Sequence, residues 1–207
     1  MPGDLLERFP LFPLGLVLLP QELVPLHIFE DRYKQMITRC LDDDSEFGIV
    51  WLGDDGLRDI GCTARITRVI ERFEDGRLNI LVEGAQPFRL LRRIEDLQYP
   101  AGDVELLEDF QPDGDPELAQ RARASYAELV ARATDEEPDV DEIAQLDAFG
   151  MAATVEHPPE AKQALLELRD ENDRLRMVEE MFRTAMKHVA YAEEAAERAQ
   201  TNGSVPH

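Results

Sequence analysis

Residues 9–33 are the most apolar stretch of the chain, and their pattern predicts its first elements. Prolines at positions 10, 13, 20 and 25 interrupt this stretch, and each would remove a backbone donor and clash with a preceding helical turn. Gln21 and Glu22 also break the apolar run, so it does not fit a membrane-spanning helix. We therefore expect two or three short buried strands here, broken at Gly15 and Pro20.

Helical spacing replaces this extended pattern from residue 30 to residue 41. Apolar residues recur there at intervals of three and four, which places them on one face of a helix. These residues are Tyr33, Met36, Ile37 and Cys40. Aspartates at positions 42–44 end the helix. They could bind a cation, but no calcium-loop pattern follows them, so we interpret them as a solvated turn and propose no metal site.

Residues 47–106 show β-type patterning, with apolar and β-branched runs separated by turn signals. The pair Asp75-Gly76 is the strongest hairpin signal of the chain. Gly84 interrupts a later apolar run and suggests a bulge or bend of the kind that closes small barrels. The predicted strands cover residues 47–52, 60–73, 78–82, 88–94 and 104–106. Together they predict a strongly bent antiparallel sheet, a small barrel, with one helix inserted early.

Residues 109–116 mark a boundary, because they combine two prolines, one glycine and three aspartates. Beyond it the periodicity is helical. Asp115 and Pro116 form an N-cap and a first-turn proline, which predict a helix to about residue 133. Further helices are predicted from Asp139 to about residue 157, after the prolines at 158 and 159, and over residues 170–200. The chain is thus predicted to be an α+β protein with a β-rich subdomain at residues 1–110 and an α-helical subdomain at residues 111–207.

The last predicted helix carries an apolar stripe along its length. The stripe consists of Leu175, Val178, Phe182, Ala185, Val189 and Ala192. Such a helix can pack against its own chain or pair weakly with a second copy, so a homo-oligomer through this helix is one open alternative.

Charge narrows the classes of function. The chain has 44 acidic and 22 basic residues, a net charge of −22, with no basic tail. Binding to nucleic acid and to anionic lipid both depend on cationic contacts, so we expect neither. The two cysteines, Cys40 and Cys62, form no C-x-x-C motif and are expected to be reduced, partly buried thiols. The acidic N-terminus does not fit a signal peptide, so we expect a cytoplasmic protein.

The end of the apolar stretch resembles the start of a known domain. It fits the pattern P-L-x-I-F-E-x-R-Y of the N-terminal, substrate-binding domain of the ATP-dependent protease Lon. The matching residues are Pro25, Leu26, His27, Ile28, Phe29, Glu30, Asp31, Arg32 and Tyr33. Residues 61–66, 76–78, 82–84 and 88–89 resemble further parts of that domain, and residues 146–149 and 162–167 resemble its helical part. The resemblance covers about residues 9–190.

This resemblance implies a PUA-like pseudo-barrel followed by an α-helical bundle that ends in a long helix. It also implies a non-catalytic protein that recognises unfolded or degron-bearing polypeptides, or that acts as an adaptor for a protease or chaperone. The ATPase of Lon would require a P-loop, but none of the three lysines follows a glycine. Ser45, Ser125 and Ser204 lie in a turn, a helix and the tail, which are poor settings for a nucleophile. We therefore expect no catalytic residue and no cofactor.

Within the motif, His27, Glu30 and Arg32 could be taken for a catalytic cluster, but we prefer a structural interpretation. Glu30 and Arg32 are expected to cap and pair at the helix start, and His27 is expected to be a hydrogen-bonded strand residue. Pro25, Phe29 and Tyr33 belong to the same structural motif.

Seven arginines between residues 65 and 93 form the one local concentration of positive charge. They are Arg65, Arg68, Arg72, Arg77, Arg89, Arg92 and Arg93. Because PUA domains bind RNA, an RNA-binding PUA-like module is the alternative function. The acidic surroundings favour solvated arginines paired with the glutamates at 71, 74, 83 and 95.

Apolar surface beside a sheet edge can accept an unfolded peptide by strand addition or in shallow pockets. The candidate contact residues are Leu16, Val17, Leu18, Leu19 and Trp51.

Overall fold

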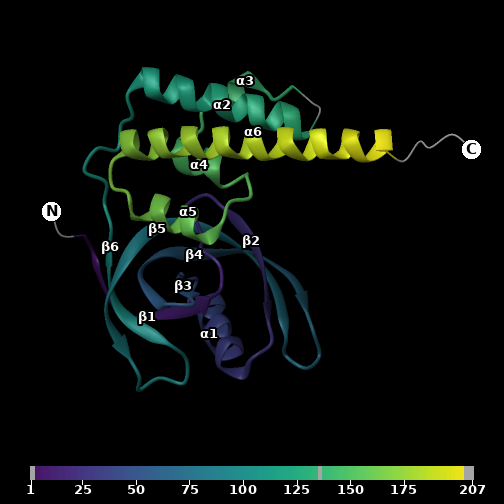
Figure 1. Ribbon diagram of the computed structural model, residues 1–207. Coiled ribbons are helices and arrows are strands. Elements are labelled where there is room, and N and C mark those ends of the chain that lie inside the picture. Colours follow the sequence, from purple (N-terminus) through teal and green to yellow (C-terminus); the bar gives the residue numbers. More distant parts are fainter. Residues whose placement is uncertain (1–2, 135–136, 203–207) are drawn as a thin grey trace, which may run out of the picture.

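The computed structural model describes residues 3–134 and 137–202 and confirms an α+β fold. The strands are β1 (Leu5–Leu14), β2 (Leu23–Ile28), β3 (Phe47–Gly53), β4 (Gly56–Arg72), β5 (Leu78–Ile94) and β6 (Ala101–Leu106). The helices are α1 (Asp31–Asp42), α2 (Pro116–Thr134), α3 (Val140–Ile143), α4 (Ala148–Ala152), α5 (Pro159–Glu167) and α6 (Glu171–Asn202). Figure 1 shows the strands rolled together beneath a layer formed by α2 to α6. We call these parts the barrel and the helical half; a domain boundary at residue 110 stays a prediction.

The six strands form one mixed sheet whose pairing closes on itself. The strand order is β2-β5-β4-β3-β1-β6, and β5 also pairs with β6, so five strands make a ring that β2 extends. β1 and β3 pair in parallel, with Leu11 opposite Gly48, whereas the other five pairings are antiparallel. The prediction of a wholly antiparallel sheet is corrected at this pair. A parallel pair needs a long crossover, which β2 and α1 provide.

β5 runs through Gly84, where the sequence suggested a break, and forms the bulge that was the other expectation. From the pair Cys62–Pro87 to the pair Ala64–Gly84, β5 advances three residues while β4 advances two. A Cβ atom at Gly84 would lie 2.0 Å from the carbonyl oxygen of Leu19. Only glycine therefore lets the loop after β1 cross so close to β5.

Helix α1 buries the face that its periodicity predicted. The buried residues are Tyr33, Met36, Ile37 and Cys40. They belong to a cluster of buried side chains that extends from Phe47 in the barrel to Phe182 in the helical half. The two parts thus share a continuous core.

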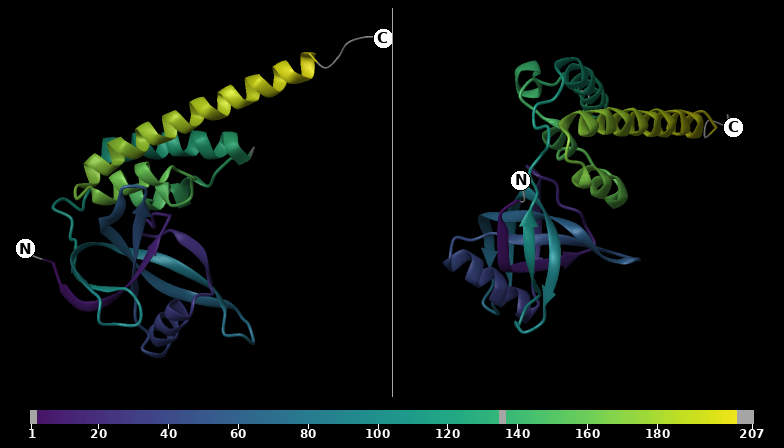
Figure 2. Two further views of the ribbon diagram at one scale, coloured as in Figure 1. Left: turned by 60° about the horizontal axis from the view of Figure 1, so that its bottom comes forward. Right: turned by 90° about the vertical axis from the view of Figure 1, so that its left-hand side faces the viewer.

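Helices α2 and α6 form the main packing pair of the helical half. Figure 2 shows that α6 extends beyond the end of α2. The rings of Tyr126 on α2 and Phe182 on α6 lie 5.5 Å apart, between their centroids. Leu175 and Val178 of the predicted α6 stripe are buried with Phe182. Residues 185 and 189 of the stripe are half-buried, and the side chain of residue 192 lies outside the described part.

The helix starts follow from side-chain caps. Asp115 accepts hydrogen bonds from the first-turn amides of α2, and Asp139 does the same for α3, as predicted. The prediction of one helix from Asp139 to about residue 157 is wrong. The carboxylate of Asp147 accepts a hydrogen bond from the Gly150 amide at 2.7 Å and starts α4, whose five residues are all buried. A second cap therefore divides the segment into two short helices.

None of the helices among the described residues is both long enough and apolar enough to cross a membrane.

Candidate functional site

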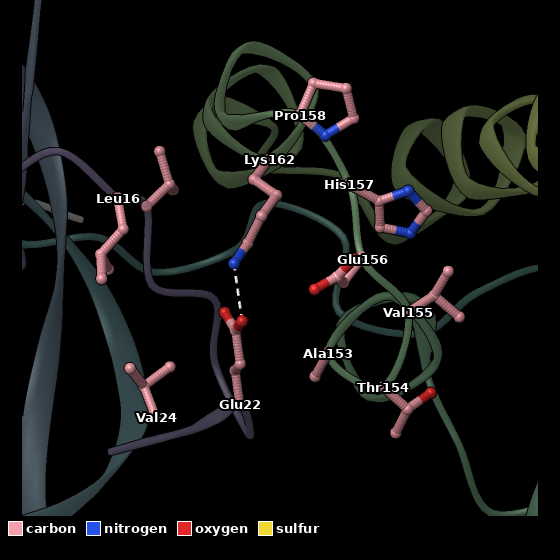
Figure 3. A pocket seen from close by; sticks show the side chains of 11 residues that line it. Leu16, Glu22, Val24, Ala153, Thr154, Val155, Glu156, His157, Pro158 and Lys162 are labelled. Atoms are coloured by element: carbon pink, nitrogen blue, oxygen red, sulfur yellow. Dashed lines mark hydrogen bonds and ion pairs between the residues drawn. The ribbon is translucent and has the colours of Figure 1, made fainter. Parts of the chain in front are cut away.

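A groove of about 610 Å³ lies between the barrel and the helical half, and we call it the barrel–helix groove (Figure 3). One wall is the loop after β1 together with the start of β2, and the other is the segment that leads from α4 into α5. The groove is lined by Leu16, Val17, Glu22, Val24, Ala153, Thr154, Val155, Glu156, His157, Pro158 and Lys162. Most of these side chains are apolar, so the groove offers hydrophobic contacts in a shallow, open setting.

An ion pair crosses the groove and joins its walls. The Nζ atom of Lys162 lies 2.6 Å from Oε1 of Glu22, and the two side chains are only 13% and 15% exposed. The other carboxylate oxygen of Glu22 accepts a hydrogen bond from the Leu19 amide at 2.9 Å. Figure 3 shows the two charged groups facing each other between the loop and α5. Because each charge is neutralised by the other, the groove gains little net charge from them.

Two further contacts fix the helical half on the barrel. Nε2 of Gln21 donates to both carboxylate oxygens of Asp147, each at 3.0 Å. Nε2 of Gln163, a buried residue of α5, donates to the Ile60 carbonyl oxygen on β4 at 3.2 Å. The groove walls are therefore held in place without a ligand.

His157 separates the groove from a second hollow. Its ring lies 6.0 Å from that of Phe182, between centroids, and its Nε2 atom is buried without a hydrogen-bond partner among the described residues. Burial, assisted by the nearby charge of Lys162, lowers the pKa of His157 to about 4. The imidazole is therefore neutral at pH 7 and presents a largely apolar surface.

The second hollow, of about 530 Å³, runs between α5 and α6, and we call it the α6 hollow. Its floor is formed by Met177, Met181 and Ala185 on α6 and by Ala161 on α5. It shares residues 156–158 with the barrel–helix groove, so the two depressions are neighbours on either side of this segment. Methionine side chains adapt to differently shaped ligands, which suits a surface with little sequence selectivity.

Comparison with known proteins identifies the domain that carries this groove. A family model described as the ATP-dependent protease La (LON) substrate-binding domain matches residues 8–184. The chain belongs to this family. The match is to the Lon substrate-binding domain alone, without the ATPase and peptidase domains of Lon.

Relatives and solved structures agree with the assignment to the Lon substrate-binding family. Lon protease 2 of Myxococcus xanthus is 27% identical over 86% of this chain and 24% of its own length. Lon protease of Paraburkholderia phytofirmans is 28% identical over 91% of this chain and 25% of its own length. The chain therefore spans about a quarter of the length of these curated relatives.

The fold is likewise that of solved Lon N-terminal domains. The crystal structure of a Lon N-terminal domain protein from Xanthomonas campestris has a TM-score of 0.64 and 25% identity, covering 84% of this chain and 97% of that one. The N-terminal domain of Mycobacterium avium complex Lon protease has a TM-score of 0.64 and 20% identity, covering 85% of this chain and 98% of that one. The second likeness concerns the fold only.

The structure separates the five candidate contact residues into two groups. Leu16 is half-buried and lines the barrel–helix groove; Val17 also borders the groove but is only 3% exposed and packs in the core. Leu18, Leu19 and Trp51 are 1%, 0% and 8% exposed and belong to the core, so a bound peptide cannot reach them in this conformation. The loop turns inward where it crosses Gly84, and the sequence pattern alone does not show this turn. Of the five candidates, Leu16 therefore has the most accessible position in the groove, and its contact with a peptide stays a prediction.

The Lon-type motif positions the start of α1. Glu30 is the N-cap residue of α1, but its side chain makes no capping hydrogen bond. Instead its carboxylate pairs with Arg32 at 2.9 Å, and the Arg32 guanidinium lies 4.6 Å from the centre of the Tyr33 ring. Burial raises the pKa of the Tyr33 hydroxyl. The expected pairing is present, whereas the expected side-chain cap is not.

Other residues of the motif lie on or near the surface. Nδ1 of His27 is 2.6 Å from Oδ1 of Asn79 on β5, which agrees with a hydrogen-bonded strand residue. Phe29 stacks against His27 with 5.8 Å between ring centroids, yet its side chain is 59% exposed. Phe29 is therefore not a core residue, and Pro25 is exposed as well.

Three of the seven clustered arginines form ion pairs with other residues that the structure describes. Arg65 pairs with Glu83 at 3.1 Å, as predicted. Arg77 pairs with Asp75 at 2.7 Å and Arg92 with Asp103 at 2.6 Å, and aspartate partners were not expected there. Arg65–Glu83 and Arg92–Asp103 join neighbouring strands, whereas Arg77–Asp75 lies within the turn between β4 and β5.

Polar clusters of the described residues show no arrangement suited to metal binding. No group of three or more His, Cys, Asp or Glu side chains among residues 3–134 and 137–202 could hold a metal ion. Asp43, in the acidic run after α1, lies 3.4 Å from the Arg39 guanidinium. Cys40 and Cys62 are free and buried, and burial raises the pKa of both thiols.

Proposed function

We propose that this chain binds unfolded or degron-bearing polypeptides in the barrel–helix groove, without catalysing a reaction, and thereby serves a protease or chaperone as a recognition module. The observation that carries this proposal is the mainly apolar surface formed by two neighbouring depressions on a member of the Lon substrate-binding family. A hydrophobic segment can place successive side chains along it without any particular sequence.

The size of the groove supports weak, reversible binding. Burying one valine or leucine side chain contributes about 1.5–3 kcal/mol, and the cost of ordering a flexible chain offsets much of that gain. Two or three such contacts, after that cost, give a dissociation constant of the order of millimolar. Reversible binding of this strength suits a module that passes its substrate to another protein.

Pocket binding agrees better with the structure than strand addition at β2. Gly84 donates to the Glu22 carbonyl at 3.0 Å, and the register of β2 and β5 is regular. In an antiparallel pair, the backbone polar groups of successive residues point alternately toward the partner strand and away from it. The backbone groups of Leu23, Pro25 and His27 therefore point to the outer edge of β2. Pro25 has no amide hydrogen, which leaves a gap in the donors that an added strand needs.

RNA binding is the alternative, and salt dependence distinguishes it from polypeptide binding. An RNA complex loses affinity steeply as salt rises, because phosphate contacts release counterions. Ion pairs at Arg65, Arg77 and Arg92 already reduce the positive charge available for phosphate. We therefore expect negligible binding of poly(U) at 150 mM salt.

The test is a fluorescence-anisotropy titration with reduced, carbamidomethylated α-lactalbumin as the unfolded probe. Leu16→Asp places a charge in the groove and is expected to weaken binding by about tenfold, a loss of about 1.4 kcal/mol. Leu91→Asp is the matched control, because Leu91 is a surface leucine of the barrel, 53% exposed and outside the groove. Equal affinity of both variants and the unmodified chain would refute the proposed site, and binding of poly(U) in preference to lactalbumin would support the alternative.

A further inference from the structure

A separate apolar groove lies on the helical half between α2 and the segment that carries α3. Its volume is about 580 Å³, and we call it the α2–α3 groove. One side is formed by Ala124, Ala127 and Ala131 of α2, and the other by Pro138, Val140 and Ile143. It shares no lining residue with the barrel–helix groove or the α6 hollow. It is therefore a second surface, independent of the proposed function.

The walls of the α2–α3 groove are held in place by contacts of their own. Ile143 is 8% exposed and anchors α3 in the core. The Arg123 guanidinium on α2 donates from Nε and Nη2 to the Leu146 carbonyl oxygen, at 3.0 and 2.8 Å. Asp139 caps α3 through the amide of Asp141 at 2.8 Å. The groove is thus preformed, so a ligand need not order it.

Small side chains on one wall and an exposed apolar side chain on the other suit a helix. The three alanines are spaced by three and four residues, so they lie on one face of α2 and let a second helix approach closely. Val140, whose side chain is 78% exposed, stands beside them. A helix in this groove would cover Val140 and pack its apolar stripe on the alanine face, as in other helix-in-groove complexes.

The charge around the groove selects the partner. Glu128 and Glu137 line it, and neither forms an ion pair with another described residue. Among the described residues that line the groove, the only cation is Arg123, whose guanidinium is already directed to the Leu146 carbonyl. A second copy of this chain, with a net charge of −22, would bring further negative charge to this rim. A partner helix with lysines or arginines beside its apolar stripe would be attracted instead.

We propose that the α2–α3 groove is a docking site for a basic amphipathic helix of another protein. This interaction goes beyond polypeptide recognition in the barrel–helix groove. It would attach the module to a partner while the recognition groove stays open.

The test uses a synthetic labelled peptide of about 18 residues, five helical turns, with a leucine and alanine stripe flanked by lysines. The full chain is titrated by anisotropy, and hydrogen exchange locates the contact. We expect protection of residues 116–134 and 140–146, and binding that is about tenfold weaker in Val140→Asp. A peptide with glutamate in place of each lysine is expected to bind at least about tenfold more weakly than the lysine peptide.

Ile70→Asp is the matched control, because Ile70 is an apolar side chain of β4 that is 50% exposed and far from the groove in sequence. Circular dichroism confirms that each variant is folded. Equal binding of the lysine and glutamate peptides, or unchanged affinity in Val140→Asp, would overturn the proposal. Binding of unfolded α-lactalbumin, measured with the same variants, is expected to stay unchanged, so failure of this site and failure of the recognition groove are distinguishable.

Discussion

The variant Lys162→Met removes the positive charge from the ion pair that crosses the barrel–helix groove. The partners lie 2.6 Å apart and their side chains are 13% and 15% exposed, so water screens them poorly. Two unit charges about 4 Å apart attract by about 4 kcal/mol at an effective dielectric constant near 20. Desolvation of both groups offsets most of that attraction, so the intact pair contributes little net stability.

Removing one partner has a larger effect than this net contribution. In Lys162→Met the carboxylate of Glu22 stays in the groove wall, with the Leu19 amide as its remaining partner. An uncompensated charge at a partly buried position costs about 2–3 kcal/mol. The double variant Glu22→Gln/Lys162→Met removes both charges and is expected to recover about half of that loss.

Urea unfolding at pH 7, followed by far-ultraviolet circular dichroism, measures these differences as changes in the free energy of unfolding. Lys34→Met is the matched control, because Lys34 pairs at 3.2 Å with Asp31, whose side chain is 92% exposed. We expect that variant to lose about 0.5 kcal/mol. The reasoning is refuted if Lys162→Met and Lys34→Met lose equal stability, or if the double variant is less stable than Lys162→Met.

Three further predictions concern stability. The pKa of the folded-state His157 is lowered to about 4, so between pH 6.5 and 4 the unfolded chain takes up a proton that the folded chain does not. The contribution of the neutral ring to the free energy of unfolding is therefore complete above pH 6.5 and is lost as the pH falls through this window. A pKa change of this size corresponds to about 3 kcal/mol, which solvent screening at the half-buried ring reduces to about 2 kcal/mol. His157→Phe is expected to remove this pH dependence, measured by urea unfolding at several pH values, and parallel curves for both proteins would contradict the reasoning. Gly84→Ala is expected to lower the free energy of unfolding by more than about 2 kcal/mol, because the new Cβ atom meets the Leu19 carbonyl. Gly15→Ala is the control, because a Cβ atom there has no neighbour within 4 Å, and it is expected to cost less than about 1 kcal/mol. Thermal unfolding compares the two variants, and equal melting temperatures would count against the close contact at Gly84. Phe29→Ser is expected to change the free energy of unfolding by less than about 1 kcal/mol, because Phe29 is 59% exposed. A loss near 3 kcal/mol in urea unfolding would show instead that Phe29 contributes to the packing of the core.

Local patterns were sufficient for most elements of this fold, but not for the division of α3 from α4 or for the continuity of β5 through Gly84. The spacing of Tyr33 and Met36 predicted the buried face of α1, and Asp75-Gly76 predicted the turn between β4 and β5, where Gly76 has a φ of 82°. The parallel pairing of β1 with β3 was not predictable in this way. Apolar alternation shows which face of a strand is buried, but it does not show which strand lies beside it.

The site was less predictable than the fold, because distant parts of the chain build it. Leu16 and Lys162 line the same groove although nearly the whole barrel separates them in sequence. Leu16 and Leu19 are chemically alike, yet the first lines the groove and the second is in the core. Their difference arises from the close crossing at Gly84, which is a tertiary contact without a local signal.

Pro25 has a further consequence for a protein that is expected to hold unfolded chains. An open sheet edge can recruit unfolded segments that contain strand-forming residues into growing cross-β aggregates. The missing amide of Pro25 interrupts the outer edge of β2, the end strand of the sheet order. This edge is therefore a poor template for polymerisation, and under the proposed function it would protect the module from coaggregating with bound unfolded chains.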